Sequence, residues 1–187
     1  MFLFKQQLVN DFIENPYKDG VFTLPLQLHF FSIDNFKDIF LNSKIIAYGV
    51  SGSLKKSRNL QCVSRFLLYF ENNKIIEFSS NLTMSSDKWN EYGSIVLAVH
   101  DIDEIIAHDN ISIEKFNINP ILIKSIQKII IQDEKLLIDC GIVFGADENL
   151  DIMIATTFVH SVTVKAPFST GKFDTEYYEE DFKFVPL

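Results

Sequence analysis

The chain has 187 residues; 47% of them are hydrophobic, 22% are charged, and the formal net charge at pH 7 is −8. These values exclude an intrinsically disordered or collagen-like chain, and the length is typical of one domain, which we expect over residues 1–187. The negative charge and the 17 Lys and Arg residues argue against binding to nucleic acid or to an anionic membrane, because both need clustered basic side chains. The charge favours a cationic protein partner, although acidity on its own also serves solubility.

Three features of the sequence predict a cytoplasmic protein. Cys62 and Cys140 lack the spacing of a zinc site or of a disulfide framework. Residues 1–9 lack the basic start and the small-residue cleavage site of a secretory signal peptide. No stretch approaches the about 18 apolar residues that span a bilayer. A reducing compartment is therefore expected.

Taken in chain order, the first segments predict two short helices and a strand between them. Residues 3–13 carry their hydrophobic side chains on one helical face, which predicts a helix. Residues 21–31 alternate hydrophobic and polar side chains, which predicts one half-buried strand with Pro25 at an edge or a bulge. A short helix is predicted at residues 34–41, with Asp34 as its N-cap.

Strands dominate the prediction for the middle of the chain. Hydrophobic patterning predicts strands at residues 44–50, 61–70, 74–79 and 94–100. The turn between the second and third of these contains Asn72 and Asn73, which tolerate positive φ and so favour a hairpin. Residues 80–93 are polar and predict a long loop, and residues 101–108 predict one or two helical turns.

The second half of the chain predicts an antiparallel meander. Pro120 suits the first position of a helix, but residues 121–131 are so rich in β-branched side chains that a strand stays open. Residues 136–158 predict a hairpin that turns at 145–149, and residues 160–165 predict a third strand. The core residues expected from this meander are Ile142, Ile152, Ile154 and Val162. The predicted fold class is α+β, a single domain built on an antiparallel sheet with a few peripheral helices.

The densest polar cluster of the sequence lies between residues 100 and 109. A helical conformation would put Glu104 and His108 on one face at i and i+4, a spacing that can bind a metal. A metal-dependent hydrolase that uses the cluster from His100 to His108 is therefore one candidate function. The residue order matches neither the HExxH motif nor a two-His, one-carboxylate site, so we favour a solvated turn.

Other polar residues form no catalytic motif. Residues 49–57 contain Gly, Ser and Lys, but with the spacing of neither a phosphate-binding P-loop nor a GxSxG nucleophile elbow. The sequence places no Ser or Cys nucleophile beside His29 or His160. Cys140 is predicted to be buried and inert, next to a bulge or a close backbone contact at Gly141. We therefore predict no enzyme activity and no cofactor.

Residues 168–187 interleave aromatic and acidic side chains. Such a segment can bind a basic partner, because aromatic rings supply contact area and carboxylates pair with Lys or Arg. In the alternative, the aromatic side chains pack back across the sheet and the acids face water, which still leaves the acids available to a partner. We favour this alternative for the aromatic side chains.

In composition the chain resembles bacterial immunity proteins, which are small acidic proteins that neutralise toxin domains; the resemblance involves no motif. It implies a protein-binding role in which an acidic surface covers the basic substrate-binding surface of a toxin. The residues predicted to contact the partner are Asp101, Asp103, Glu104, Asp109, Glu176, Glu179, Glu180 and Asp181. A small-ligand carrier with a Phe-lined cavity is a further candidate, and the oligomeric state stays open.

The sequence predicts that no metal binds tightly at His100, Asp103, Glu104 or His108. Protein purified without added metal should contain no stoichiometric zinc, manganese or iron in elemental analysis, because an exposed turn does not hold a preformed set of ligands. Stoichiometric metal that is lost on His108→Ala would contradict this prediction.

Overall fold

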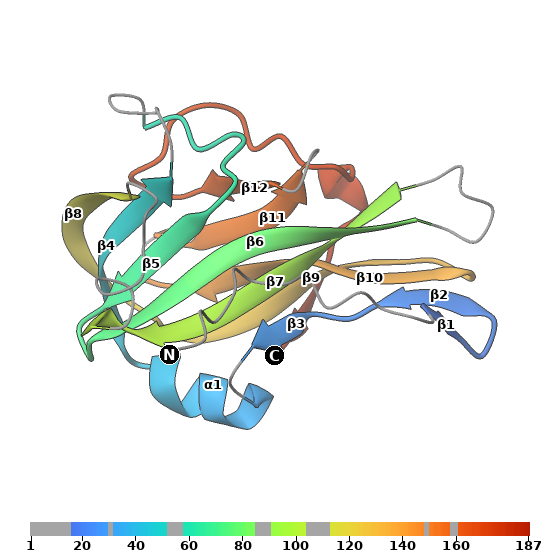
Figure 1. Ribbon diagram of the computed structural model, residues 1–187, viewed down its shortest axis with the longest axis horizontal. Helices are drawn as coiled ribbons and strands as arrows, with labels where there is room; N and C mark the ends of the chain where they lie inside the picture. The colour runs from blue at the N-terminus through green and yellow to red at the C-terminus, as the bar shows by residue number, and fades with distance from the viewer. Residues whose placement is uncertain are drawn as a thin grey trace, which may run out of the picture.

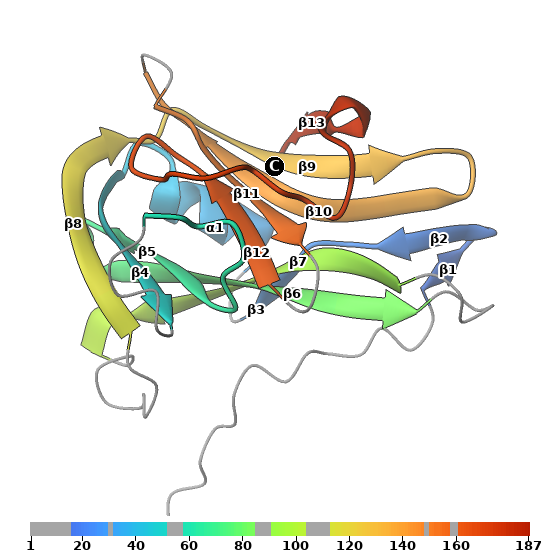
Figure 2. The ribbon, with the colours of Figure 1, turned by 90° about the horizontal axis from the view of Figure 1, so that it is seen from above.

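The computed structural model describes residues 16–29, 32–51, 58–84, 91–103, 113–147, 150–157 and 161–187. Within these ranges two β-sheets lie face to face (Figure 1, Figure 2). Sheet A consists of β1 (Tyr17–Lys18), β2 (Val21–Leu24), β9 (Ser125–Gln132), β10 (Leu136–Gly145), β11 (Ile152–Thr157), β12 (Ser161–Lys165) and β13 (Lys183–Pro186). Sheet B consists of β3 (Gln27–His29), β4 (Lys44–Ser51), β5 (Phe66–Phe70), β6 (Lys74–Met84), β7 (Glu91–Asp101) and β8 (Ile113–Leu122). The described helices are α1 (Ile33–Phe40) and the short 3-10 helix η1 (Glu179–Asp181).

Both sheets are mixed, so the expected antiparallel sheet is only partly right. Sheet B has the strand order β3-β7-β6-β5-β4-β8. In sheet A, β10 pairs with β9 along one edge, and along its other edge it pairs first with β2 and then with β11. The pairs β2–β10 and β3–β7 are parallel, and the other described pairs of strands are antiparallel.

Both parallel pairs come from the segment that was expected to be one strand at residues 21–31. The structure divides it at Pro25 and Leu26: β2 belongs to sheet A and β3 belongs to sheet B. Proline has no N–H to donate to a strand ladder, so the pairing ends there and the chain passes from one sheet to the other. Residues 30 and 31 and the helix predicted at 3–13 lie outside the described residues.

The predicted meander in the second half is confirmed for the residues that the structure describes. Strands β10, β11 and β12 pair in antiparallel order. The expected core residues Ile142, Ile152, Ile154 and Val162 are each 0% exposed. Residues 158–160, at the last turn, are outside the described part of the chain.

For residues 120–131 the sequence left helix and strand open, and the structure has strands: residues 113–122 form β8 and residues 125–132 form β9. Pro120 is tolerated because β8 is an edge strand of sheet B and its pairing with β4 is irregular there: Ile45 pairs with Ile121 and Ala47 with Asn117. The β-branched side chains of residues 121–131, which kept the strand alternative open, therefore favour strands on both sides of the short connection between β8 and β9.

Two further boundaries differ from the prediction. The loop expected at residues 80–93 is wrong, because β6 continues to Met84 and β7 begins at Glu91. Ser80 and Asn81 are polar but buried, so composition alone misled the prediction. Helix α1 begins at Ile33 and is capped by Ser32 rather than Asp34; the Ser32 hydroxyl accepts a hydrogen bond from the Asn35 N–H at 3.3 Å. No helix in the described ranges is long and apolar enough to cross a bilayer.

Phenylalanine rings fill the space between the two sheets. Phe40 contacts Phe36 and Phe70 with ring centroids 4.8 and 4.6 Å apart. The Phe144 ring lies 6.3 Å from that of Phe70 and 6.1 Å from that of Phe78. Because these rings belong to α1 and to both sheets, they join the layers into one main core.

Truncation of Phe144 should destabilise the protein strongly, because it leaves a cavity where α1 and the two sheets meet. We expect Phe144→Ala to lower the free energy of unfolding by about 3–5 kcal/mol in urea titrations. Phe184→Ala is the matched control; this ring is 48% exposed, and its loss should cost about 1 kcal/mol or less. Equal losses for the two variants would contradict this view of the core.

Candidate functional site

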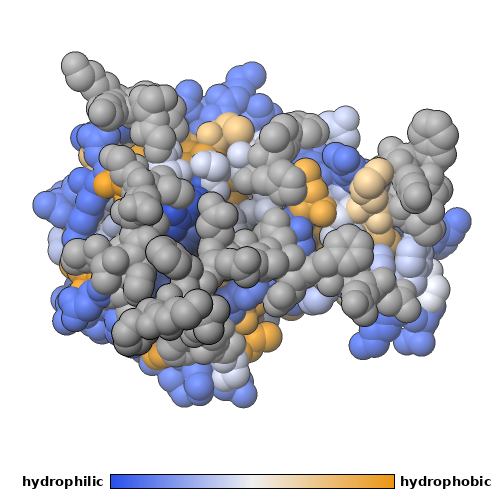
Figure 3. Space-filling model, viewed as in Figure 1, coloured by the Kyte–Doolittle hydropathy of each residue, from blue (hydrophilic) through white to orange (hydrophobic). Residues whose placement is uncertain are grey.

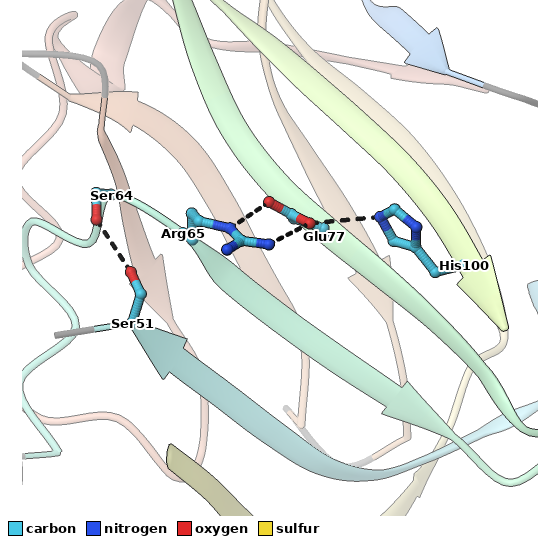
Figure 4. A network of polar contacts seen from close by, with 5 residues as sticks. All are labelled: Ser51, Ser64, Arg65, Glu77 and His100. Carbon is cyan, nitrogen blue, oxygen red and sulfur yellow. Dashed lines mark hydrogen bonds and ion pairs between the residues drawn. The ribbon is translucent and has the colours of Figure 1, made fainter. Parts of the chain in front are cut away.

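A charged network lies on sheet B, on the face turned away from the main core (Figure 4). The even-numbered Ile76 and Phe78 of β6 point into the core, so Glu77 between them points outward. Arg65, the residue directly before β5, donates two hydrogen bonds to the Glu77 carboxylate. The distance from Nε to Oε1 is 2.6 Å, and that from Nη2 to Oε2 is 2.9 Å. His100 Nε2 of β7 lies 3.4 Å from Glu77 Oε2. Glu77 is nevertheless only 2% exposed, so this is a desolvated charge with defined partners.

The partners keep Glu77 ionised. Burial alone would raise the pKa of Glu77, but the hydrogen bonds from His100 and Arg65, together with their charges, outweigh burial and lower it. The network therefore joins β6 to β7 and to the residue that precedes β5.

Two serines lie near this network. The Ser51 and Ser64 hydroxyl oxygens are 3.0 Å apart and bond each other. In Figure 4, Arg65 and Glu77 lie between these serines and His100, so neither hydroxyl is bonded by the imidazole. The arrangement lacks the contact between nucleophile and base that nucleophilic catalysis uses, and we interpret it as a structural ion-pair network.

The polar cluster predicted at residues 100–109 is only partly described. His100 turns toward Glu77, Asp101 pairs with Lys74 at 2.7 Å, and Asp103 is exposed. Glu104, His108 and Asp109 lie outside the described residues. Among the described side chains there is no group of three or more His, Cys, Asp or Glu residues that could hold a metal.

The C-terminal segment is bound to sheet A by its aromatic side chains. We call residues 173–182 the strap; Figure 2 shows this part of the chain, in red, lying across sheet A and including η1 near its end. Phe173, Tyr177 and Phe182 pack against a second hydrophobic cluster that includes Ile129 and Val143. The prediction that the aromatic side chains pack back on the sheet is confirmed for these three rings. Tyr178 and Phe184 are exceptions, because they are 74% and 48% exposed.

After the strap the chain forms β13, a strand that the sequence analysis missed. β13 pairs antiparallel with β9, so the C-terminal residues extend sheet A. Its short length and its final Pro186 give little hydrophobic alternation, and its partner is more than fifty residues earlier in the chain. This pairing holds the far end of the strap and, with it, η1.

Three exposed acids of the strap are the residues of η1. Glu179, Glu180 and Asp181 are exposed, as predicted, and the nearest base to Glu179 is Lys165, with Nζ–Oε2 3.7 Å. A shallow cavity of about 340 Å³ lies between η1 and the end of β9. It is lined by Ile131, Gln132, Asp133, Glu180, Asp181, Phe182 and Lys183. Asp133 was not among the predicted residues; its place in the turn after β9 gave no sign that η1 lies beside it.

The remaining predicted acids lie elsewhere. Glu176 is half-buried, and its carboxylate accepts the Gly93 N–H at 3.1 Å, so it faces into the protein rather than toward solvent. Asp101 and Asp103, at the end of β7, are far from η1 in both ribbon views (Figure 1, Figure 2). The two acidic clusters therefore do not form one continuous patch.

The face toward the viewer in Figure 1 is also the face shown in Figure 3, where the described surface is mainly hydrophilic. Hydrophobic residues appear there only as small separate patches among the described side chains. The described part of this face therefore offers mainly polar and charged groups to a partner.

Comparison of the chain with protein-family models, curated protein sequences and solved structures found no match. A functional proposal therefore depends on the geometry of the described residues.

Glu77→Gln should destabilise the protein at pH 7, because Arg65 and His100 lose the carboxylate that they bond. We expect a loss of about 3 kcal/mol in the free energy of unfolding. The pKa of Glu77 is lowered by folding, so its contribution is present above the ordinary value of 4.5 and is lost as the pH falls through the folded-state pKa. The difference between wild type and variant should therefore shrink below about pH 4.5.

Glu71→Gln is the control for this experiment. Glu71 is an exposed partner of Lys44 at 3.5 Å, and its replacement should cost less than about 1 kcal/mol. If Glu77→Gln and wild type differ equally at pH 3 and pH 7, the carboxylate is not the source of the stability.

Proposed function

We propose that this protein binds a basic protein through an acidic surface centred on η1, and that the partner is a bacterial toxin domain which it neutralises. The observation that carries the proposal is the exposed ring of Tyr178 directly before Glu179, Glu180 and Asp181. An aromatic ring that is 74% exposed beside three carboxylates combines the two side-chain types that basic partners contact. A cytoplasmic site of action belongs to the same proposal.

The cavity beside η1 gives this surface a specific feature. Its lining residues include the acidic Asp133, Glu180 and Asp181 and the apolar Ile131 and Phe182. A Lys or Arg side chain of the partner fits this chemistry, because its methylene stem can cover apolar atoms while its charged end bonds carboxylates. Lys183 Nζ is directed to the Gln132 main-chain oxygen at 3.4 Å, so one positive charge already lies at the rim.

The contact surface proposed here is narrower than the one predicted from sequence. Asp101 and Asp103 are far from η1, and Asp101 is already paired with Lys74. Glu104 and Asp109 are outside the described residues. We therefore centre the contact on the strap and treat Asp101 and Asp103 as lying outside it.

The two alternative functions receive less support from the described residues. The Phe side chains that a carrier would need as a cavity lining contact one another in the main core. The metal-dependent hydrolase would use the cluster from His100 to His108, of which only residues 100–103 are described, and the described side chains form no group of three or more possible metal ligands.

Charge reversal at η1 should weaken binding to the partner. A pulldown from the native host would supply the partner, and the triple variant Glu179→Lys, Glu180→Lys, Asp181→Lys should then lower its affinity by well over tenfold, which needs only about 1.4 kcal/mol. Tyr178→Ala should weaken it as well, because it removes the aromatic contact. Association of the wild-type protein should slow steeply with added salt, while dissociation changes less.

The control is Asp101→Lys, Asp103→Lys, which changes the charge far from η1. This double variant should change affinity by only a few fold, and unfolding experiments should find all these variants close to wild type in stability. The proposed surface would be rejected if the affinity for the partner did not change with the η1 charge reversals or with salt. It would also be rejected if reversal at Asp101 and Asp103 weakened binding more than reversal at η1.

A further inference from the structure

Two consecutive residues of the strap bond the main chain of one residue of sheet B, Gly93. The Glu176 carboxylate accepts the Gly93 N–H at 3.1 Å, and the Tyr177 hydroxyl donates to the Gly93 carbonyl oxygen at 3.0 Å. The Glu176 N–H in turn bonds the Thr156 carbonyl oxygen of β11 at 3.2 Å. The strap is thus fixed to sheet A by its main chain and to β7 of sheet B by these side chains.

Gly93 makes this contact possible because it has no side chain. A Cβ at this position would collide with Glu176 Oε2 and would lie 3.2 Å from the Thr156 side chain. The carboxylate therefore occupies the space that any other residue at position 93 would fill. Glu176 is a built-in part of the junction between the strap and β7.

The burial of the second oxygen of the Glu176 carboxylate is not compensated by a hydrogen bond from a described residue. Glu176 Oε2 is buried and has no hydrogen-bond partner in the described part of the structure. Burial raises the pKa of Glu176 to about 7, the Gly93 hydrogen bond opposes this rise, and the nearby charge of Glu91 adds to it. An ionised Glu176 is therefore costly at a contact that a neutral carboxyl group tolerates.

Among the described residues, the titratable groups that act on Glu176 or on its neighbour Tyr177 carry no compensating positive charge. β7 contributes Glu91 and Tyr92, β10 contributes Cys140, and the strap contributes Tyr177. Burial raises the pKa values of Cys140 and Tyr177, so both stay neutral through the physiological range. β11 contributes Thr156, which does not titrate.

We propose that Glu176 is a proton-controlled latch: its protonated carboxyl group keeps the strap docked on β7, and its ionisation loosens the strap. The folded-state pKa lies above the ordinary value of 4.5, so the stabilisation is fully present below about pH 4.5 and is lost as the pH rises through about 7. Because the strap carries η1, the latch would also regulate the proposed binding surface; this consequence rests on the proposed function, whereas the latch itself does not.

Hydrogen exchange in the free, full-length protein tests the latch. The amides of Gly93 and Glu176 report on the two ends of the contact, and their protection, corrected for intrinsic exchange rates, should fall at least about tenfold between pH 5.5 and pH 8.5. Glu176→Gln, which stays neutral, should keep its protection across this range. Asp174→Asn is the matched control on the same strap, because Asp174 is exposed and bonds Gln61 at 2.9 Å; it should follow wild type.

A carboxyl NMR titration keeps the test decisive if Glu176→Gln does not fold. Glu176 in the wild-type protein should titrate near pH 7, and Glu91→Gln should move the midpoint downward by removing a repulsive charge. A wild-type midpoint near the ordinary 4.5, or the same loss of protection in wild type and Glu176→Gln, would overturn the latch. If the latch experiments fail but charge reversal at η1 still weakens partner binding, the proposed function stands without the latch. If the latch experiments succeed but charge reversal at η1 leaves binding unchanged, only the proposed function is rejected.

Discussion

The buried carboxylate of Asp139 lies where β10 exchanges one neighbour for another. Residues 136–138 of β10 pair with β2, and residues 141–144 pair with β11 on the same edge. Between them Asp139, 5% exposed, accepts the Leu26 N–H at 2.8 Å and binds Lys128 Nζ at 2.7 Å. It thus satisfies the main-chain donor of Leu26, two residues after the end of β2 at Leu24, and Lys128 compensates its charge. Without both partners, a desolvated carboxylate would remain at the point where sheet A divides.

The division of sheet A determines where the strap can lie. The β9–β10 register shifts between Asp139 and Gly141, so Cys140 is an extra residue in its strand. After this bulge, Ile142 and Phe144 face the main core, whereas Ile138 and Cys140 belong to the cluster that the strap covers. The bulge thereby gives sheet A two buried faces. Just past the last pair of β10 with β11, Thr156 accepts the strap's main chain, and Glu176 and Tyr177 reach sheet B there.

Local patterns in the sequence predicted the hairpins well, and contacts between distant segments poorly. The turn at Asn73, where φ is +62°, and the alternation along β10–β12 are local signals, and both predictions hold. The alternation of hydrophobic and polar residues on both sides of Pro25 is the same whether the chain stays in one sheet or passes to another. It therefore could not reveal that β2 belongs to sheet A and β3 to sheet B. The hairpin register Leu67↔Glu77 could have placed Arg65 diagonally beside Glu77, but no local signal joins Asp133 to η1.

The count of 25 Asp and Glu residues overstates the number of carboxylates that this protein can offer to a partner. Glu77 and Asp139 are buried within ion pairs, and Glu176 is bonded to the main chain of β7. These acids stabilise strands and the strap, so their contribution is to position other residues. In the proposed function, recognition of a basic surface would depend on the carboxylates that are exposed together, chiefly Glu180 and Asp181 beside Tyr178. Their position is set by β13 at one end of the strap and by the Glu176–Gly93 contact at the other, so buried and exposed acids act on the same surface in different ways.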